Sequence, residues 1–297
     1  MEPPMEDTVP LLNTFPYVCC CPRCYAVSTP STSKCHRDVR KGRHESNVLY
    51  LLQSRPTEMI TLVIGAKEEK VPCHMALLGF YSEFFDAALY GDFPTPQEIG
   101  LPDESLEEVN VFVSWMYTGQ IFPGLVCDES LWILGDKLRS QYFANDIMHL
   151  LISKYANLPP DSGHYIEAAT ADMVYSNTTS GSKLRKFVKE VILVEGPLSI
   201  DNSGGQKFKE DWKALIARGG DLVTDIALEG SFYNEDFGEG PWYPSNQEKY
   251  LEPIQTRSLV EFTQGNSRSA GGGRLKGGRK DERIDVITGG EEEFPIA

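Results

Sequence analysis

The sequence predicts an α+β protein, with a small β-sheet flanked by a helical cluster, a C-terminal mainly helical extension and disordered termini. Two short β-branched runs, residues 61–64 and 70–74, flank a polar turn, as in a β-hairpin. Amphipathic stripes with helical spacing follow over residues 75–155, and each needs a neighbour to bury it. Helical patterns return over residues 165–218, whereas residues 263–297 are rich in glycine and charge.

These patterns divide the chain into four parts. Residues 1–56 carry Cys, Ser and Pro with little periodicity, so we expect a mostly flexible segment with an ordered element near residues 46–52. Residues 57–157 form the compact domain, and residues 158–262 form the C-terminal helical extension. Residues 263–297 hold too little apolar surface to offset chain entropy, which predicts a disordered tail.

The first half of the compact domain is expected to alternate strands and short helices. The first strand ends at Gly65, and the returning strand runs through His74 into a helix. Ser82 is expected to cap the next helix and Gly91 to end it. The side chains of this region expected to face inward are Leu77, Leu78, Tyr81, Phe84, Phe85, Ala88 and Leu89. A short third strand is expected over residues 99–101.

The second half of the domain is expected to be helical. Ser105 and Glu108 form a capping-box pattern, and Gly119 ends the helix that follows. Asp128 is expected to cap the next helix, and Asn145 the one after it. The apolar stripes of these helices include Leu106, Val109, Val113 and Met116, then Leu131, Leu134, Leu138 and Tyr142, then Ile147, Leu150, Leu151 and Tyr155.

Composition excludes several classes of protein. The 297 residues carry 28 Lys and Arg against 43 Asp and Glu, a net charge of −15, which argues against a nucleic-acid binder. The acidic, proline-rich N-terminus has no secretory signal pattern, and no run of 18 apolar residues predicts a membrane span. We therefore expect a cytoplasmic or nuclear location, with the seven cysteines reduced.

The motif order in the compact domain resembles the BTB/POZ family. The motifs are residues 71–78, a strand entering a His-led helix, then residues 82–89, 101–103, 112–119 and 134–138. This resemblance implies a protein-interaction platform with no catalytic centre and no cofactor. Its expected partners are other proteins, with self-association through the domain.

The extension also carries motifs with a family resemblance. Residues 175–185, Asp211-Trp212 and residues 219–222 are similar to segments that follow the BTB domain in many small fungal proteins. Those relatives lack the kelch repeats and zinc fingers of other BTB proteins, and neither pattern occurs in this sequence.

Two departures from the family pattern mark candidate interaction residues. BTB domains that form the standard homodimer often carry an acidic and a basic residue where this chain has Met59 and Met75. Both charges are absent together, so no unpaired buried ion remains, and we expect a weaker or absent standard homodimer. Adaptors for cullin-type ubiquitin ligases often carry an apolar-x-Glu motif; here Phe93 takes the apolar position and Thr95 stands where the Glu would be, which weakens the adaptor interpretation.

The alternative function rests on the N-terminal cysteines. Cys21, Cys24, Cys35 and either His36 or His44 could hold a zinc ion, as in a regulatory or nucleic-acid-associated protein. Three consecutive cysteines also suit lipidation or surface thiols, and the Cys21/Cys24 pair resembles a redox dithiol without its usual β-α-β context.

Other reactive groups favour structural interpretations. His74 is expected to be a core histidine with a satisfied ring, and Cys73 and Cys127 are expected to be thiols in apolar settings. The basic residues between Arg268 and Arg283 lack interleaved aromatic residues and indicate a solvated linker. Because no phosphate-binding loop or nucleophile elbow occurs, we expect no enzyme activity.

Overall fold

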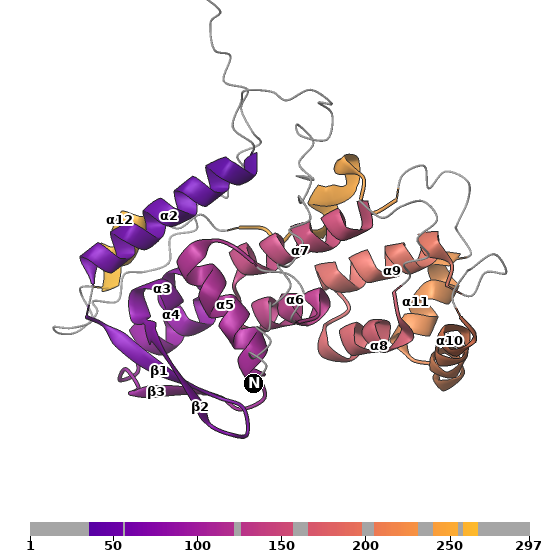
Figure 1. Cartoon of the computed structure of the whole chain (residues 1–297), viewed down its shortest axis with the longest axis horizontal. Coiled ribbons are helices and arrows are strands. Elements are labelled where there is room, and N and C mark those ends of the chain that lie inside the picture. Colours follow the sequence, from indigo (N-terminus) through magenta and orange to yellow (C-terminus); the bar gives the residue numbers. More distant parts are fainter. Residues whose placement is uncertain are drawn as a thin grey trace, which may run out of the picture.

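The computed structural model describes residues 36–55, 57–121, 126–156, 166–197, 205–230, 240–254 and 258–266. These residues form an elongated molecule with a small sheet at one end and helices α8 to α11 at the other (Figure 1). The α+β class and the helical extension predicted from the sequence are both confirmed.

The sheet has three strands in the order β2-β1-β3. They are β1 (Met59–Ile64), β2 (Glu69–His74) and β3 (Glu98–Leu101). Strands β1 and β2 pair antiparallel with Met59 opposite His74, so the predicted hairpin is confirmed, and β3 pairs parallel to β1. Ile60, Leu62 and Ile64 alternate along β1 and are buried, which gives the sheet one apolar face for the helices to cover.

Three helices belong to this part of the compact domain, two between β2 and β3 and one after β3. They are α3 (Met75–Tyr81), α4 (Glu83–Tyr90) and α5 (Leu106–Thr118). The predicted caps hold, because the Ser82 hydroxyl accepts a hydrogen bond from Phe85 N and the Ser105 hydroxyl accepts one from Glu108 N. The inward placement of Phe84 was wrong. Its neighbour Phe85 takes the buried direction, and Phe84 is 38% exposed.

Aromatic side chains fill the centre of the domain. Phe112 and Trp115 on α5 lie within 5.2 Å and 5.1 Å of the Phe143 ring, measured between ring centroids. The Trp115 indole N–H donates to the Asp146 carboxylate at 2.9 Å, so its one polar atom is satisfied.

Two predicted helix caps were wrong. Helix α6 spans Asp128–Lys137, with Cys127 as the N-cap residue, so Asp128 lies inside the first turn, where its charge favours the helix dipole. Helix α7 spans Gln141–Ala156 and begins four residues before Asn145. Asn145 is buried inside this helix because its side-chain amide bonds the backbone of Glu252, a partner more than 100 residues away in sequence.

Helices also form at both ends of the described chain. Helix α2 (His36–Ser54) is much longer than the ordered element predicted near residues 46–52 and packs on α3 and α5. Helix α12 (Leu259–Asn266) packs on α2. The prediction of disorder from residue 263 onward was therefore wrong for residues 263–266, which are the last four residues of α12. The predictions for residues 1–35 and 267–297 lie outside the described residues.

The C-terminal extension is helical as predicted. It comprises α8 (Ala168–Asn177), α9 (Lys183–Glu195), α10 (Gln206–Arg218), α11 (Asp221–Gly230) and the 3₁₀ helix η1 (Pro244–Tyr250). The Trp212 indole on α10 is buried and donates to Ile166 O at 3.1 Å. Ile216 on the same helix is 39% exposed, although the helical spacing of Trp212, Leu215 and Ile216 predicts that all three face inward.

A returning segment joins the extension to the compact domain. The Trp242 ring stacks on Tyr155 of α7 with centroids 6.1 Å apart, and the Tyr250 ring meets Phe187 of α9 at 5.3 Å. The buried side chains of the two parts form one continuous cluster. No helix in the described ranges has the length and hydropathy to cross a membrane.

Candidate functional site

The predicted pair Met59 and Met75 lies where the hairpin meets α3. Met59 pairs with His74 in the sheet register, and Met75 N donates to Glu58 O at 2.9 Å, so the two backbones are adjacent. Met59 is 45% exposed, whereas Met75 packs partly against the core. The junction therefore presents an apolar side chain to solvent.

A charged pair beside this junction was missed from the sequence. The Arg55 guanidinium lies 3.1 Å from the Glu58 carboxylate and 5.5 Å from the centroid of the Tyr90 ring. Its second terminal nitrogen donates to Thr263 O of α12 at 3.1 Å. The three-residue spacing of Arg55 and Glu58 was the only available signal, and it gives no hint of Tyr90 or α12.

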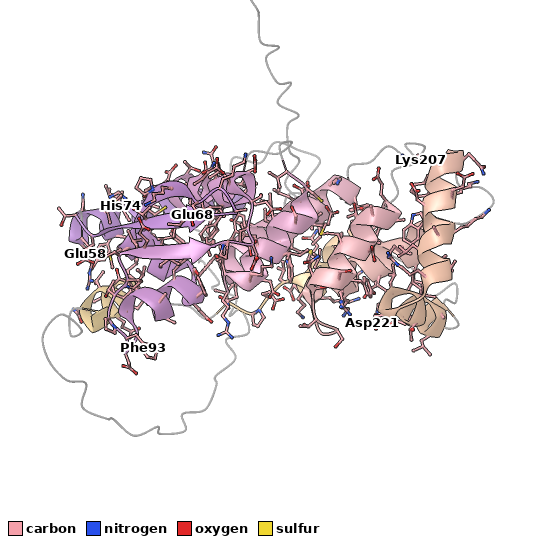
Figure 2. The ribbon with its side chains drawn as sticks, turned by 90° about the horizontal axis from the view of Figure 1, so that it is seen from below. Glu58, Glu68, His74, Phe93, Lys207 and Asp221 are labelled. Carbon is pink, nitrogen blue, oxygen red and sulfur yellow. The ribbon has the colours of Figure 1, made fainter. Side chains whose placement is uncertain are left out.

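Phe93 and Thr95 lie in the loop between α4 and β3. Thr95 Oγ1 donates to Leu89 O at 3.1 Å, which satisfies a carbonyl in the last turn of α4. Phe93 is 84% exposed, the highest value among the large apolar side chains of the described residues. Figure 2 shows Phe93, Glu58 and His74 at one end of the molecule and Lys207 and Asp221 at the other. Phe93 and the Met59 junction therefore lie at the same end.

His44 is the member of the predicted zinc set whose side chain the structure describes, and it is part of the fold. Its ring stacks on Tyr81 at a centroid distance of 4.7 Å, and its Nε2 lies 3.0 Å from Met116 O. The pKa of His44 is lowered from its ordinary value, because the effect of burial outweighs the opposite effect of the hydrogen bond to Met116 O. While that hydrogen bond holds, only Nδ1 remains for a metal. Cys21, Cys24 and Cys35 lie outside the described residues, as does the redox pair, and the described ranges hold no cluster of three metal-binding side chains.

Three further side chains, those of His74, Cys73 and Cys127, were predicted to have structural roles in the compact domain. His74 is half-buried, so its predicted place in the core was wrong, but its Nδ1 lies 2.7 Å from the Tyr117 hydroxyl and the ring has a hydrogen-bond partner as predicted. Cys73 is fully buried, and burial raises its pKa to about 12. The apolar setting predicted for Cys127 was wrong. The residue as a whole is exposed, while its Sγ donates to the Glu129 carboxylate at 2.9 Å; partial desolvation of the thiol, and then that negative charge, raise its pKa to about 11. Neither thiol is activated as a nucleophile.

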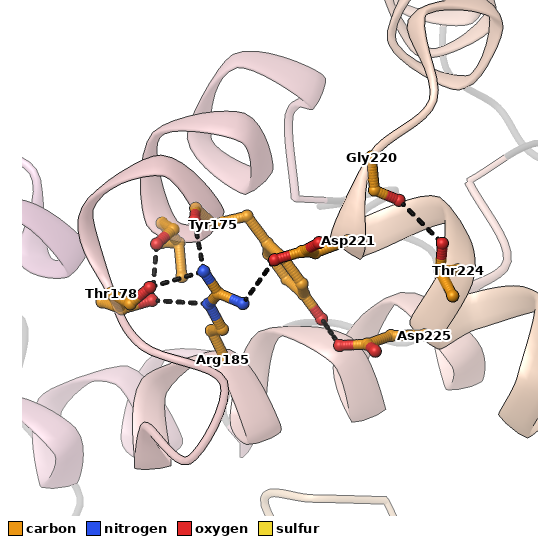
Figure 3. A network of polar contacts seen from close by, with 8 residues as sticks. Tyr175, Thr178, Arg185, Gly220, Asp221, Thr224 and Asp225 are labelled. Carbon is orange, nitrogen blue, oxygen red and sulfur yellow. Dashed lines mark hydrogen bonds and ion pairs between the residues drawn. The ribbon is translucent and has the colours of Figure 1, made fainter.

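A buried polar network joins two of the extension motifs singled out from the sequence, residues 175–185 and 219–222 (Figure 3). The Arg185 side chain on α9 is 9% exposed, and its Nε donates to Thr178 Oγ1 at 3.0 Å. Its Nη2 donates to both Tyr175 O and Thr178 O, and its Nη1 lies 3.3 Å from the Asp221 carboxylate. The guanidinium also lies 4.7 Å from the centroid of the Tyr175 ring.

This network stabilises the fold and has no free reactive group. Arg185 satisfies carbonyls at the end of α8 and bonds the first residue of α11, so it joins three helices. The Tyr175 hydroxyl donates to Asp225 at 3.1 Å, and burial, with the charge of Asp225, raises the Tyr175 pKa. A raised pKa keeps the phenol protonated, which is the opposite of what a general base requires.

Comparisons with known proteins identify the compact domain. Residues 51–155, about a third of the chain, match the family model of the BTB/POZ domain. Among solved structures, the BTB domain of human gigaxonin is similar at 14% identity, with 41% of this chain and 98% of that chain covered and a TM-score of 0.30. The BTB domain of zebrafish PATZ1 is similar at 19% identity, with the same two coverages and a TM-score of 0.29.

Proposed function

Because residues 51–155 form a BTB/POZ domain, a protein–protein interaction module, we propose that this chain is a non-enzymatic platform that binds other proteins. The binding surface we assign is the end of the domain that carries Met59 and Phe93. The observation that carries this assignment is the 84% exposure of Phe93 beside a domain whose other apolar side chains are largely buried. Aromatic side chains are enriched among the residues that dominate interface energies.

The extension supports this role by its rigid attachment. The paired hydrogen bonds between the Asn145 side chain and the Glu252 backbone, and the stacking of Trp242 on Tyr155, hold it to the BTB domain, so a partner on each part would have a fixed relative position. This arrangement suits a protein that brings two others together.

The proposed function is tested by affinity capture with paired variants. We expect Phe93→Asp to lose partners that the wild-type chain retains, because a carboxylate cannot enter an apolar site without a large desolvation cost. Leu228→Asp is the matched control, since Leu228 is 63% exposed on α11 at the far end of the molecule. If the two variants retain the same proteins as the wild type, the assigned surface is wrong.

More narrowly, we propose that the platform is a substrate adaptor for a cullin-type ubiquitin ligase, with the extension holding the substrate. Phe93 supports this proposal because it places the apolar member of the adaptor motif in solvent. Calorimetry against the N-terminal region of a cullin tests it. We expect Phe93→Ala to weaken binding at least about tenfold, as for an interface hot spot, and Thr95→Glu to strengthen it. Absence of binding by both the wild type and Thr95→Glu would remove the adaptor role and leave the broader function standing.

We also propose that self-association is weak, because Met59 and Met75 leave the hairpin junction without the charge pair of the standard homodimer. Light scattering over a hundredfold concentration range measures this directly. We expect a mass near the 33.2 kDa of one chain at micromolar concentration. A stable mass of twice that value would contradict the proposal.

A further inference from the structure

Helix α12 is an addition to the BTB domain made by the far C-terminal end of the described chain. It lies alongside α2 (Figure 1), more than 100 residues beyond the end of the domain in sequence. It has eight residues, too few for a stable helix in water without a partner surface. Its structure therefore depends on what it touches.

One aromatic side chain anchors α12. Phe262 is 5% exposed, and its ring lies 5.6 Å from the Phe80 ring and 5.8 Å from the Tyr90 ring, measured between centroids. Leu259, three residues earlier, packs partly against the core, whereas Val260 is 48% exposed. The contact thus has one deep anchor and one shallow one on the same helix face.

The surface under the anchor is shaped for an aromatic ring. Gly79 lies inside α3, where glycine is among the poorest helix formers. A Cβ atom built on Gly79 would fall 2.8 Å from the Tyr90 ring and 3.3 Å from the Phe262 ring. The missing side chain therefore makes room for both rings, which explains a glycine at this position.

Arg55 bonds the C-terminal end of α12. Its guanidinium donates to Thr263 O, one of the last four carbonyls of α12, which have no partner within the helix. A cation at this end also complements the helix dipole. Glu58 and Tyr90 hold the guanidinium in place.

From these contacts we propose that the surface formed by α2, α3 and α4 is a docking site for a short helix with Leu-x-x-Phe spacing, and that α12 occupies it in cis. A partner protein that carries a helix of this chemistry displaces α12 and binds in its place. This inference goes beyond the proposed function, because its surface contains neither Met59 nor Phe93 and its test does not depend on them.

The test uses the full chain and a fluorescent synthetic peptide of residues 257–267, with binding followed by anisotropy. The wild-type chain is expected to bind the peptide weakly, because its own α12 competes at a high effective concentration. The Phe262→Ala chain is expected to bind the peptide at least about tenfold more tightly, since its α12 has lost the anchor. The Val260→Ala chain is the matched control and is expected to behave as the wild type.

Two further variants localise the binding. A peptide with Phe262→Ala is expected to bind neither chain, and Gly79→Ala added to the Phe262→Ala chain is expected to abolish peptide binding by filling the ring site. A folded Phe262→Ala chain that binds no more tightly than the wild type overturns the proposal. An unfolded Phe262→Ala chain overturns it as well, because α12 would then be an obligatory part of the core and not an exchangeable ligand.

Discussion

Replacing Arg185 with alanine is expected to destabilise the extension strongly. The substitution leaves Tyr175 O and Thr178 O without their donor, and it also removes a hydrogen bond to the Thr178 hydroxyl. The ion pair itself contributes little, because the Asp221 side chain is 76% exposed. Most of the effect comes from the two orphaned carbonyls, and each such group costs about 1–3 kcal/mol, so we expect a loss of roughly 2–6 kcal/mol.

The free energy of unfolding is measured by urea titration at 25 °C, followed by tryptophan fluorescence and far-ultraviolet circular dichroism. For a denaturant slope of about 2 kcal/mol/M, a loss of this size lowers the midpoint by roughly 1–3 M. Trp212 lies within the extension and reports its unfolding.

Arg218→Ala is the matched control. Arg218 also pairs with an aspartate, Asp172, but both side chains lie at the surface, at 60% and 41% exposure. We expect no resolvable change in the midpoint for this variant. Arg185→Lys is expected to resemble Arg185→Ala, because an ammonium group keeps the charge and loses the fork of donors. Equal midpoints for Arg185→Ala and Arg218→Ala would refute the reasoning.

Four further predictions concern the BTB domain and helix α2. Gly119→Ala is expected to cost about 1–3 kcal/mol in a thermal-shift assay, because Gly119 has a φ of 65° and its added Cβ would lie 2.9 Å from the His44 ring. Gly42→Ala, in open space within α2, is expected to stabilise by about 0.5–1 kcal/mol, and a loss there would contradict this reasoning. Asn145→Ala is expected to lower the unfolding free energy by roughly 1–3 kcal/mol for each backbone group of Glu252 that loses its partner, and to speed amide exchange at Glu252. Unchanged exchange at Glu252 would show that the hydrogen bonds with Asn145 are not needed. Burial lowers the pKa of His44 in the folded chain below the unfolded pKa of about 6.5. The contribution of His44 to the unfolding free energy is therefore full above about pH 6.5 and is lost as the pH falls through the folded pKa. The unfolding free energies of the wild type and of His44→Gln should converge in acid.

The elements set by local rules could be predicted from the sequence. The hairpin, the Ser82 and Ser105 caps and the Gly119 stop each depend on residues within a few positions of one another. The fold class follows from these elements, because the apolar face of each must be buried against the others.

The predictions for Asn145 and α12 failed because the partners of these residues lie far away in the sequence. Asn145 has the composition of a helix cap, but Glu252 takes its side chain, and no local pattern announces that contact. Helix α12 is too short and too weakly periodic to predict alone, since it depends on Phe80, Tyr90 and Arg55. The same reason applies to the candidate site, where the sequence identifies Phe93 and Met59 and only the structure reveals their exposure.

The central claim is that the domain end carrying Met59 and Phe93 binds other proteins. Hydroxyl-radical footprinting tests it most directly, because methionine and phenylalanine side chains are both oxidised when exposed. The purified chain is compared with and without a captured partner, and Tyr243 of the extension, which is 37% exposed, serves as the internal reference. We predict that the partner lowers oxidation at Met59 and Phe93 and leaves Tyr243 unchanged. Unchanged oxidation at Met59 and Phe93 in a saturated complex would contradict the account.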